Sequence, residues 1–201
     1  MKLRMILAYV WVIMPVFAVV AHYAWGKQYL RQDRLWDDVK VAVQLEETAM
    51  ESITVENLEI AEKAYSEVIE SLDEKDSREF EAQVVLARAR CRLYKGELVS
   101  AMMDLETLLG NSAKEGVSQE IQRDIRETLA RCLFGIAWVM RNEGASQENW
   151  TEIADRARQH FRYLAEVAPN EEERMESAKN LEVVIALEYV DSVVLTPMRP
   201  L

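Results

Sequence analysis

The chain of 201 residues has few of the residues that interrupt helices and few of those that carry out most catalytic chemistry. It contains six glycines, four prolines, two cysteines and two histidines, and only His160 lies beyond the first 25 residues. Half of its residues are hydrophobic. A sequence so poor in turn residues, and rich in Ala, Leu, Glu and Arg, predicts an all-α fold.

The sequence offers little material for an active site or a metal site. It has no Gly-x-Ser-x-Gly stretch, no glycine-rich phosphate loop, no HExxH, no CxxC and no paired histidines. A nucleophilic site of the Ser–His–acid or Cys–His–acid type would have to use His160. We therefore expect a protein that is not an enzyme and that has no catalytic residue, no bound metal and no cofactor.

Charge is distributed unevenly along the chain, whose formal net charge is −11. Residues 1–34 carry +4 and residues 35–201 carry −15. An acidic body repels phosphate groups, so we expect no binding to nucleic acid. Cys91 and Cys132 each lie in an apolar-periodic stretch, which predicts buried free thiols. A disulfide between them would require an exported body in which the two helices pack side by side.

The N-terminal region has the features of a membrane anchor. Residues 5–26 contain no formal charge over 22 positions, which is long enough for a helix to cross the hydrocarbon core. Aromatic and basic side chains at the end of this run are typical of a membrane interface: Tyr23, Trp25, Lys27, Tyr29, Arg31 and Arg34. We expect residues 1–26 to be an N-terminal tail and transmembrane signal anchor, and residues 27–41 a basic juxtamembrane helix or linker. A signal peptide cleaved near Ala21 is the alternative.

Two features of the N-terminal region predict opposite orientations. The short basic tail favours export of the body, whereas the basic residues that follow residue 26 favour a body that faces the cytoplasm. We expect a single-pass protein of a bacterial inner membrane with its body exported. A cytoplasm-facing body is the alternative.

The body contains three stretches in which a small residue is followed, four positions later, by a large apolar one. These pairs are Ala61 and Tyr65, Ala101 and Leu105, and Ala157 and Phe161. Residues four apart share a helical face, so each alanine marks a place where another helix approaches closely. An amphipathic helix precedes each stretch, near 35–53, 77–95 and 118–142, and a last helix is predicted near 171–191. Gly96 is suited to end one helix and Ser118 to begin another.

These hairpins resemble the tetratricopeptide repeat family over residues 42–190, as three degenerate units. In the third unit, the residues that match are Phe134, Gly135, Trp138, Ala157, Phe161, Leu164 and Pro169. In the second they are Ala89, Gly96, Ala101 and Leu105, and in the first Ala49, Leu58, Ala61 and Tyr65. The period is about 40 residues instead of the family's 34, with extra residues near 73–78 and 145–152, so another kind of helix-pair repeat is the alternative.

The resemblance implies an α–α superhelix of about three degenerate helix pairs in residues 42–191, closed by a C-terminal capping helix and followed by a loose tail at 192–201. In that family the inner surface of the superhelix binds peptides or protein segments. An N-terminal single transmembrane helix would precede this domain.

Six cationic and aromatic side chains are candidates for partner binding: Arg88, Arg92, Tyr94, Arg131, Trp138 and Arg141. Arg88 and Arg92 share one helical face, while Arg90 points elsewhere. The arginines either line a groove for an acidic peptide or a C-terminal carboxylate, or they pair with nearby acids such as Glu81 or Glu127. For Trp138 the alternative is packing between helices.

The stretch "IADRARQHFRYLAEVAP", residues 153–169, contains three arginines and His160. We interpret it as a packing helix, because its apolar residues recur at helical spacing and His160 has no catalytic neighbour in the pattern. The sequence thus predicts a membrane-anchored adaptor or scaffold that binds a protein or peptide partner, in secretion or in envelope complex assembly. A structural subunit held in a larger membrane complex through its transmembrane helix is the alternative. A homo-oligomer formed through the apolar last helix is a further alternative.

Overall fold

The computed structural model describes residues 31–49, 54–73 and 76–189. The predicted anchor at 5–26, the predicted interface residues Tyr23, Trp25, Lys27 and Tyr29, and the tail at 192–201 lie outside the described residues. Within the described ranges the regular structure is helical and contains no strand. The prediction of an all-α fold is therefore confirmed.

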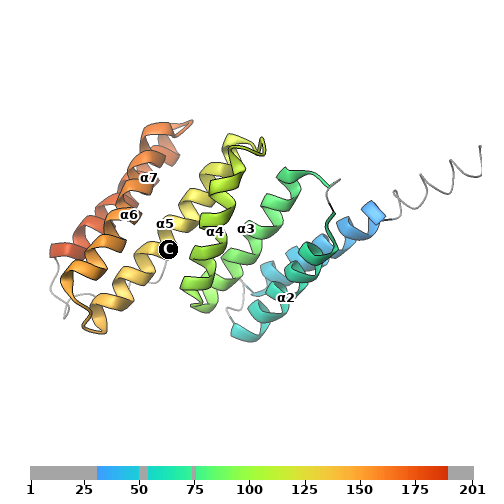
Figure 1. Ribbon diagram of the computed structural model, residues 1–201, viewed down its shortest axis with the longest axis horizontal. Coiled ribbons are helices and arrows are strands. Elements are labelled where there is room, and N and C mark those ends of the chain that lie inside the picture. Colours follow the sequence, from blue (N-terminus) through green and yellow to red (C-terminus); the bar gives the residue numbers. More distant parts are fainter. Residues whose placement is uncertain (1–30, 50–53, 74–75, 190–201) are drawn as a thin grey trace, which may run out of the picture.

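A helical segment over residues 31–49 is followed by six helices along the chain (Figure 1). These are α2 (Val55–Ser71), α3 (Arg78–Lys95), α4 (Leu98–Ser112), α5 (Gln119–Asn142), α6 (Gln147–Val167) and α7 (Glu171–Tyr189). The predicted helices agree with them to within a few residues, except at the start of α6. Residues 147–152, which we expected to be additions between repeat units, instead lengthen that helix at its N-terminal end.

Two residues define helix ends as the sequence predicts. Gly96 follows α3 with a φ of 85°, a left-handed conformation that is easily adopted only without a side chain. Its N–H donates to the carbonyl of Leu93, and the next N–H, of Glu97, donates to the carbonyl of Arg92. At the start of α5, the hydroxyl of Ser118 accepts a hydrogen bond of 3.5 Å from the N–H of Ile121. Gly96 and Glu97 are the only two residues between α3 and α4.

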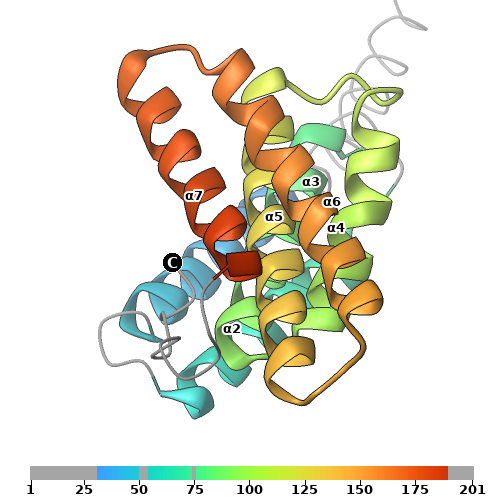
Figure 2. The same ribbon diagram turned by 90° about the vertical axis from the view of Figure 1, so that its left-hand side faces the viewer.

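The helices stack in a row, and each packs on the helix before it and the helix after it (Figure 1). In addition, α3 contacts α5 directly, and ion pairs connect α5 with α7. The odd-numbered helices α3, α5 and α7 thus lie in one layer, with α4 and α6 in a second layer beside them (Figure 2). An ion pair between Glu106 of α4 and Arg156 of α6 connects neighbours in that second layer.

The even-numbered helices bury the same pair of positions. Ala61, Ala101 and Ala157 each have 0% of their surface exposed. The large residues four positions later are also buried: Tyr65 in α2, Leu105 in α4 and Phe161 in α6. A methyl side chain lets the neighbouring backbone approach, and the large side chain fills the space one turn further on. The small–large pattern of the sequence therefore corresponds to a repeated packing arrangement in the fold.

Gly135 of α5 marks another close approach. A Cβ atom placed at this position would lie 3.1 Å from Cδ1 of Leu98, the first residue of α4. Such a distance is tighter than ordinary van der Waals contact, so the missing side chain gives Leu98 its place against α5. Successive hairpins can pack closely at this point because residue 135 has no side chain.

Two hydrophobic clusters form the core, and α3 lies between them. The larger cluster is built from α3 to α7 and contains Leu86 and Leu93, whereas the smaller one contains Val84 and Cys91 of the same helix. Leu35, only 5% exposed, belongs to the smaller cluster. The boundary that we predicted between residues 41 and 42 thus falls inside a helix whose earlier turns already contribute to the core. The folded body extends at least to residue 31.

The last helix packs onto α6, and its residues Val184 and Leu187 are buried in the larger cluster. Part of the apolar face that we considered for oligomer formation is therefore used within the chain. Over the described ranges, no helix is both long enough and apolar enough to cross a membrane.

Candidate functional site

Arg88 and Arg92 lie together, but in an ion-pair network that joins three helices. Both guanidinium groups reach the carboxylate of Asp104 in α4 at 2.8 Å. Arg92 also contacts Glu62 of α2 at 2.7 Å, and Lys95 reaches the same carboxylate at 2.6 Å. The acids that pair with these arginines are thus Glu62 and Asp104. This arrangement compensates the positive charge of Arg88 and Arg92 within the fold.

The pKa values reflect this mutual compensation. Burial by itself raises the pKa of Glu62, but hydrogen bonds from Lys95 and Arg92 outweigh it and lower the pKa below its ordinary value. For Arg92, burial favours the neutral form, yet the bond to Glu62 and the charge of Asp104 raise the pKa. The charged forms on both sides of the network are therefore stabilised by one another.

The other predicted arginines connect α5 to its neighbours. Arg131 pairs with Glu127 at 2.5 Å within α5 and with Glu176 of α7 at 3.7 Å. Arg141 donates to the carbonyl of Leu187 in α7, and its guanidinium carbon lies 5.2 Å from the centre of the Trp150 ring. Both arginines thus make contacts that hold α7 in place.

The two predicted aromatic residues lie on different helices. Trp138 of α5 is partly buried and packs against the larger core cluster, as the packing interpretation predicts. Its indole N–H is buried and has no acceptor among the described residues. Tyr94 lies near the end of α3 and is half-buried. The structure thus distributes the six candidates over the α2–α3–α4 junction and the contacts of α5, instead of gathering them in one groove.

Of the predicted membrane-interface residues, Arg31 and Arg34 are described. Arg31 makes ion pairs with Asp73 and with Asp76, the latter at 2.8 Å, and donates to the carbonyl of Ser71 at 2.9 Å. It fastens the first described turn to the connection between α2 and α3. Arg34 is exposed.

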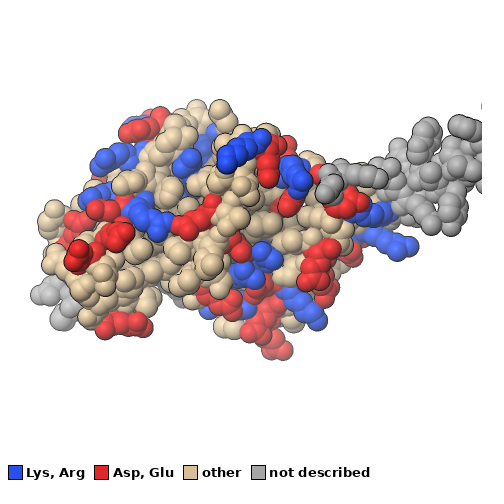
Figure 3. Space-filling model, in the orientation of Figure 1, with Lys and Arg blue, Asp and Glu red and all other residues tan. Residues whose placement is uncertain are grey.

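His160 lies half-buried on α6, among charged groups. Burial, and then the positive charges of Arg126 and Arg156, lower the pKa of its imidazole. Arg156 is paired with Glu106, and Arg158 with Asp155 and Glu188. Two of the three arginines of this stretch thus make ion pairs that lie within α6 or reach neighbouring helices, and Arg162 is exposed. On the face shown in Figure 3, side chains of both signs are interspersed over the surface.

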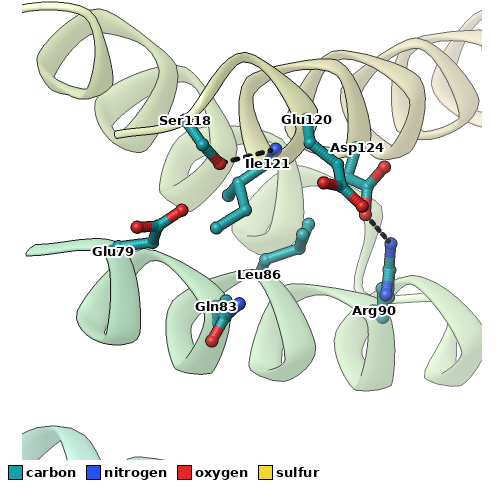
Figure 4. A pocket seen from close by; sticks show the side chains of 8 residues that line it. All are labelled: Glu79, Gln83, Leu86, Arg90, Ser118, Glu120, Ile121 and Asp124. Carbon is teal, nitrogen blue, oxygen red and sulfur yellow. Dashed lines mark hydrogen bonds and ion pairs between the residues drawn. The ribbon is translucent and has the colours of Figure 1, made fainter. Parts of the chain in front are cut away.

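An open pocket of about 310 Å³ lies between α3 and α5. Its lining residues are Glu79, Gln83, Leu86, Arg90, Ser118, Glu120, Ile121 and Asp124 (Figure 4). The α3 residues follow one another at spacings of four, three and four, so they form a single stripe along that helix. The α5 side contributes the N-cap and the first turns of the helix. Because α3 and α5 are in contact, side chains about 40 residues apart in sequence line one hollow.

Negative charge predominates in the α3–α5 pocket. Three carboxylates line it, from Glu79, Glu120 and Asp124, against one base, Arg90. Arg90 and Asp124 are 3.5 Å apart and remain 40% and 48% exposed. Within the described part of the chain, Glu79 and Glu120 have no ion-pair partner. Burial, together with repulsion from Glu127 and Glu120, raises the pKa of Asp124 despite the charge of Arg90.

A second, much smaller hollow of about 40 Å³ also borders α5. It lies between α5, α6 and α7 and is lined by Arg123, Asp124, Glu127, Leu164, Glu173, Glu176, Ser177 and Asn180. Asp124 lines both hollows. The lining residues of the two hollows thus come from α3, α5, α6 and α7. A separate pocket of about 300 Å³ lies near the N-terminal end, beside Trp36 and Phe80.

The residues that line the α3–α5 pocket are not among the site residues predicted from the sequence. Arg90 lies on a different face from Arg88 and Arg92, as predicted, but no role was predicted for that face. The stripe formed by Glu79, Gln83, Leu86 and Arg90 was a usable signal, because it brings polar side chains to one side of α3. Which helix this stripe faces depends on how the hairpins stack.

Among the described residues, no group of three or more His, Cys, Asp or Glu side chains is arranged to hold a metal ion. The chain matches no family model, and it has no significant match among curated proteins or solved structures. The function must therefore be inferred from the geometry of the chain itself.

Proposed function

We propose that the chain is a membrane-anchored helical-repeat adaptor that binds a segment of a protein partner in the α3–α5 pocket. Residues 5–26 are the anchor in this proposal, and the body is exported. The observation that carries it is the open pocket itself, which is lined by side chains from two helices of adjacent hairpins. Unpaired carboxylates beside the nearly buried Leu86 and Ile121 form a surface that a partner can complete.

The repeated packing supports a superhelix like that of the tetratricopeptide repeat family. The small and large residues matched to the second helix of each unit are buried in α2, α4 and α6. Gly135, matched to the small residue of a first helix, is the point at which Leu98 approaches. The helices α3 and α5, which correspond to the first helices of the second and third units, are the two that line the α3–α5 pocket.

The arrangement of the two hollows favours an elongated ligand. The two hollows share Asp124, and their lining residues come from α3, α5, α6 and α7. A protein segment that lies across the helices would contact both hollows, whereas a compact small molecule would fill only one of them. Open, polar grooves are more typical of peptide binding than of small-molecule sites, which are mostly enclosed and apolar.

Photo-crosslinking in native membranes tests this proposal. A benzophenone amino acid replaces Gln83 in the full-length chain, and the matched control carries it at Met103, which is 60% exposed on α4 outside the pocket. We expect a discrete adduct with one partner from position 83 and none from position 103. Equal labelling from both positions, or no adduct from position 83, would contradict binding in the pocket.

The alternative, a structural subunit held through its transmembrane helix, gives a different result in the same experiment. A crosslinker within residues 5–26, for example at Phe17, would then give the adduct while position 83 gives none.

The orientation of the chain in the membrane is tested separately with C-terminal fusions. We expect alkaline phosphatase activity, and a fluorescent GFP fusion without phosphatase activity would contradict export.

A further inference from the structure

The side chains of the α3–α5 pocket are arranged in three zones. Leu86 and Ile121, which are 4% and 7% exposed, lie at the centre (Figure 4). Glu79 lies on one side of them, and Glu120 and Asp124 lie on the other. An apolar centre is thus flanked by negative charge on both sides.

The negative charge of this pocket is only partly compensated by the protein. Glu79 and Glu120 have no ion pair with any described residue, and the contact between Arg90 and Asp124 is long and exposed. Both glutamates lie in the first turns of their helices, where a carboxylate is favourable. This position explains why glutamate is tolerated there, but it does not explain Asp124, which lies beyond the first turn beside two further acids.

The charges also exclude other occupants. An acidic segment would need free bases, but the one base among the described residues that line the pocket is Arg90, which already faces Asp124. Arg88 and Arg92, which we had considered for acidic ligands, are paired with Glu62 and Asp104. Nucleic acid would be repelled in the same way.

We propose that the α3–α5 pocket takes a protein segment in which basic side chains flank an aliphatic one. The aliphatic side chain lies over Leu86 and Ile121, one basic side chain reaches Glu79, and the other reaches Glu120 and Asp124. Long Lys and Arg side chains suit this arrangement, since their aliphatic stems cover apolar surface while their charged ends reach carboxylates. This inference rests on the proposed function, because it names the ligand of the same pocket.

Fluorescence anisotropy with the detergent-solubilised full-length chain tests the inference. The probe is a fluorescein-labelled peptide in which two arginines flank a pair of leucines. A second peptide carries neutral citrulline in place of each arginine, and a third carries glutamate. We expect the arginine peptide to bind at least about tenfold more tightly than the citrulline peptide, with an affinity that falls as salt is added.

A matched pair of variants tests whether the peptide binds in the α3–α5 pocket. The variant Glu79→Gln/Glu120→Gln/Asp124→Asn removes three charges from it. The control Glu56→Gln/Glu59→Gln/Glu70→Gln removes three exposed charges from α2. We expect the first variant to lose about tenfold in affinity for the arginine peptide and the control to lose less than about twofold. Circular dichroism of both variants tests whether they remain helical.

Each outcome separates this inference from the proposed function. Equal affinity for the arginine and citrulline peptides would overturn the inference that the ligand is basic. An equal loss of affinity for the arginine peptide in both variants would overturn it too. If a partner crosslinks at position 83 while the arginine peptide does not bind, the proposed adaptor function is supported, but the proposed basic ligand is wrong. If the arginine peptide binds in the pocket but no partner crosslinks there, the preference of the pocket for basic side chains is supported, and the proposed adaptor function is wrong.

Discussion

Arg92 and Asp104 form an ion pair of 2.8 Å between α3 and α4, and the same guanidinium reaches Glu62 of α2 at 2.7 Å. One side chain therefore ties three consecutive helices together. The carboxylates are only 22% and 15% exposed, so water screens these contacts less than it screens an ordinary surface pair. The network contributes to the cohesion of the array at the junction of its first two described hairpins.

Glu62→Gln should destabilise the protein in a pH-dependent way. The folded chain lowers the pKa of Glu62 from its ordinary value of 4.5, so its contribution is fully present above that value. That contribution disappears as the pH falls through the lower folded-state pKa. We expect a loss of about 1–2 kcal/mol in unfolding free energy at about pH 7, and a smaller loss at about pH 3. Urea titrations followed by circular dichroism measure both.

The exposed Glu59 of the same helix provides the control, since Glu59→Gln should change stability by less than about 0.5 kcal/mol. A loss of equal size at both pH values would show that Glu62→Gln acts through packing and not through charge.

Gly135→Val should destabilise the contact between α4 and α5. A Cβ at this position already comes within 3.1 Å of Leu98, and the branched side chain adds two more carbons. We expect a loss of about 2 kcal/mol, typical of an overpacked core. Gly110 is a matched control in α4, because a Cβ there meets nothing within 4 Å. Gly110→Val should change the unfolding free energy by less than about 0.5 kcal/mol, and a similar cost at both sites would refute the packing role of Gly135.

Arg31→Ala should loosen the first described helical turns. Arg31 pairs with Asp73 and Asp76 and donates to the carbonyl of Ser71, so its loss removes the contacts that fasten residue 31 to the α2–α3 connection. We expect faster amide hydrogen exchange in residues 31–49, measured by mass spectrometry, and a loss of about 1 kcal/mol. The neighbouring exposed Arg34 is the control, and Arg34→Ala should leave exchange unchanged. Equal exchange in both variants would show that Arg31 does not secure this helix.

Both cysteines should be inert while the protein is folded. Cys91 and Cys132 are free and buried, in separate hydrophobic clusters. Burial raises the pKa of each thiol to about 12, with the charges of Glu46 and Glu62 adding to the effect at Cys91. Because the thiolate is the reactive form, Ellman's reagent at about pH 8 should detect no thiol in the native protein and both in denaturant. A failure to detect thiols in denaturant would indicate a disulfide, and reaction in the native state would indicate local opening.

Much of the fold could be predicted because it depends on local patterns. Gly96 ends α3 and Ser118 begins α5 since backbone conformation and capping involve residues only a few positions apart. The recurrence of small and large residues also identified the buried face of each even-numbered helix. The start of α6 was missed, because residues 147–152 are too polar to show the apolar period and join the helix mainly through Trp150, which is buried.

The sequence by itself determined an all-α chain of successive helices and the face that most of them bury, because helical periodicity and capping are local properties. Only the tertiary structure decided which charges are compensated and which remain open to a partner. Arg92 is bonded to acids 30 positions earlier and 12 positions later in the chain, whereas the carboxylates of the α3–α5 pocket are left largely uncompensated. Electrostatic pairing depends on distances between atoms, and those distances exist only once the hairpins have stacked.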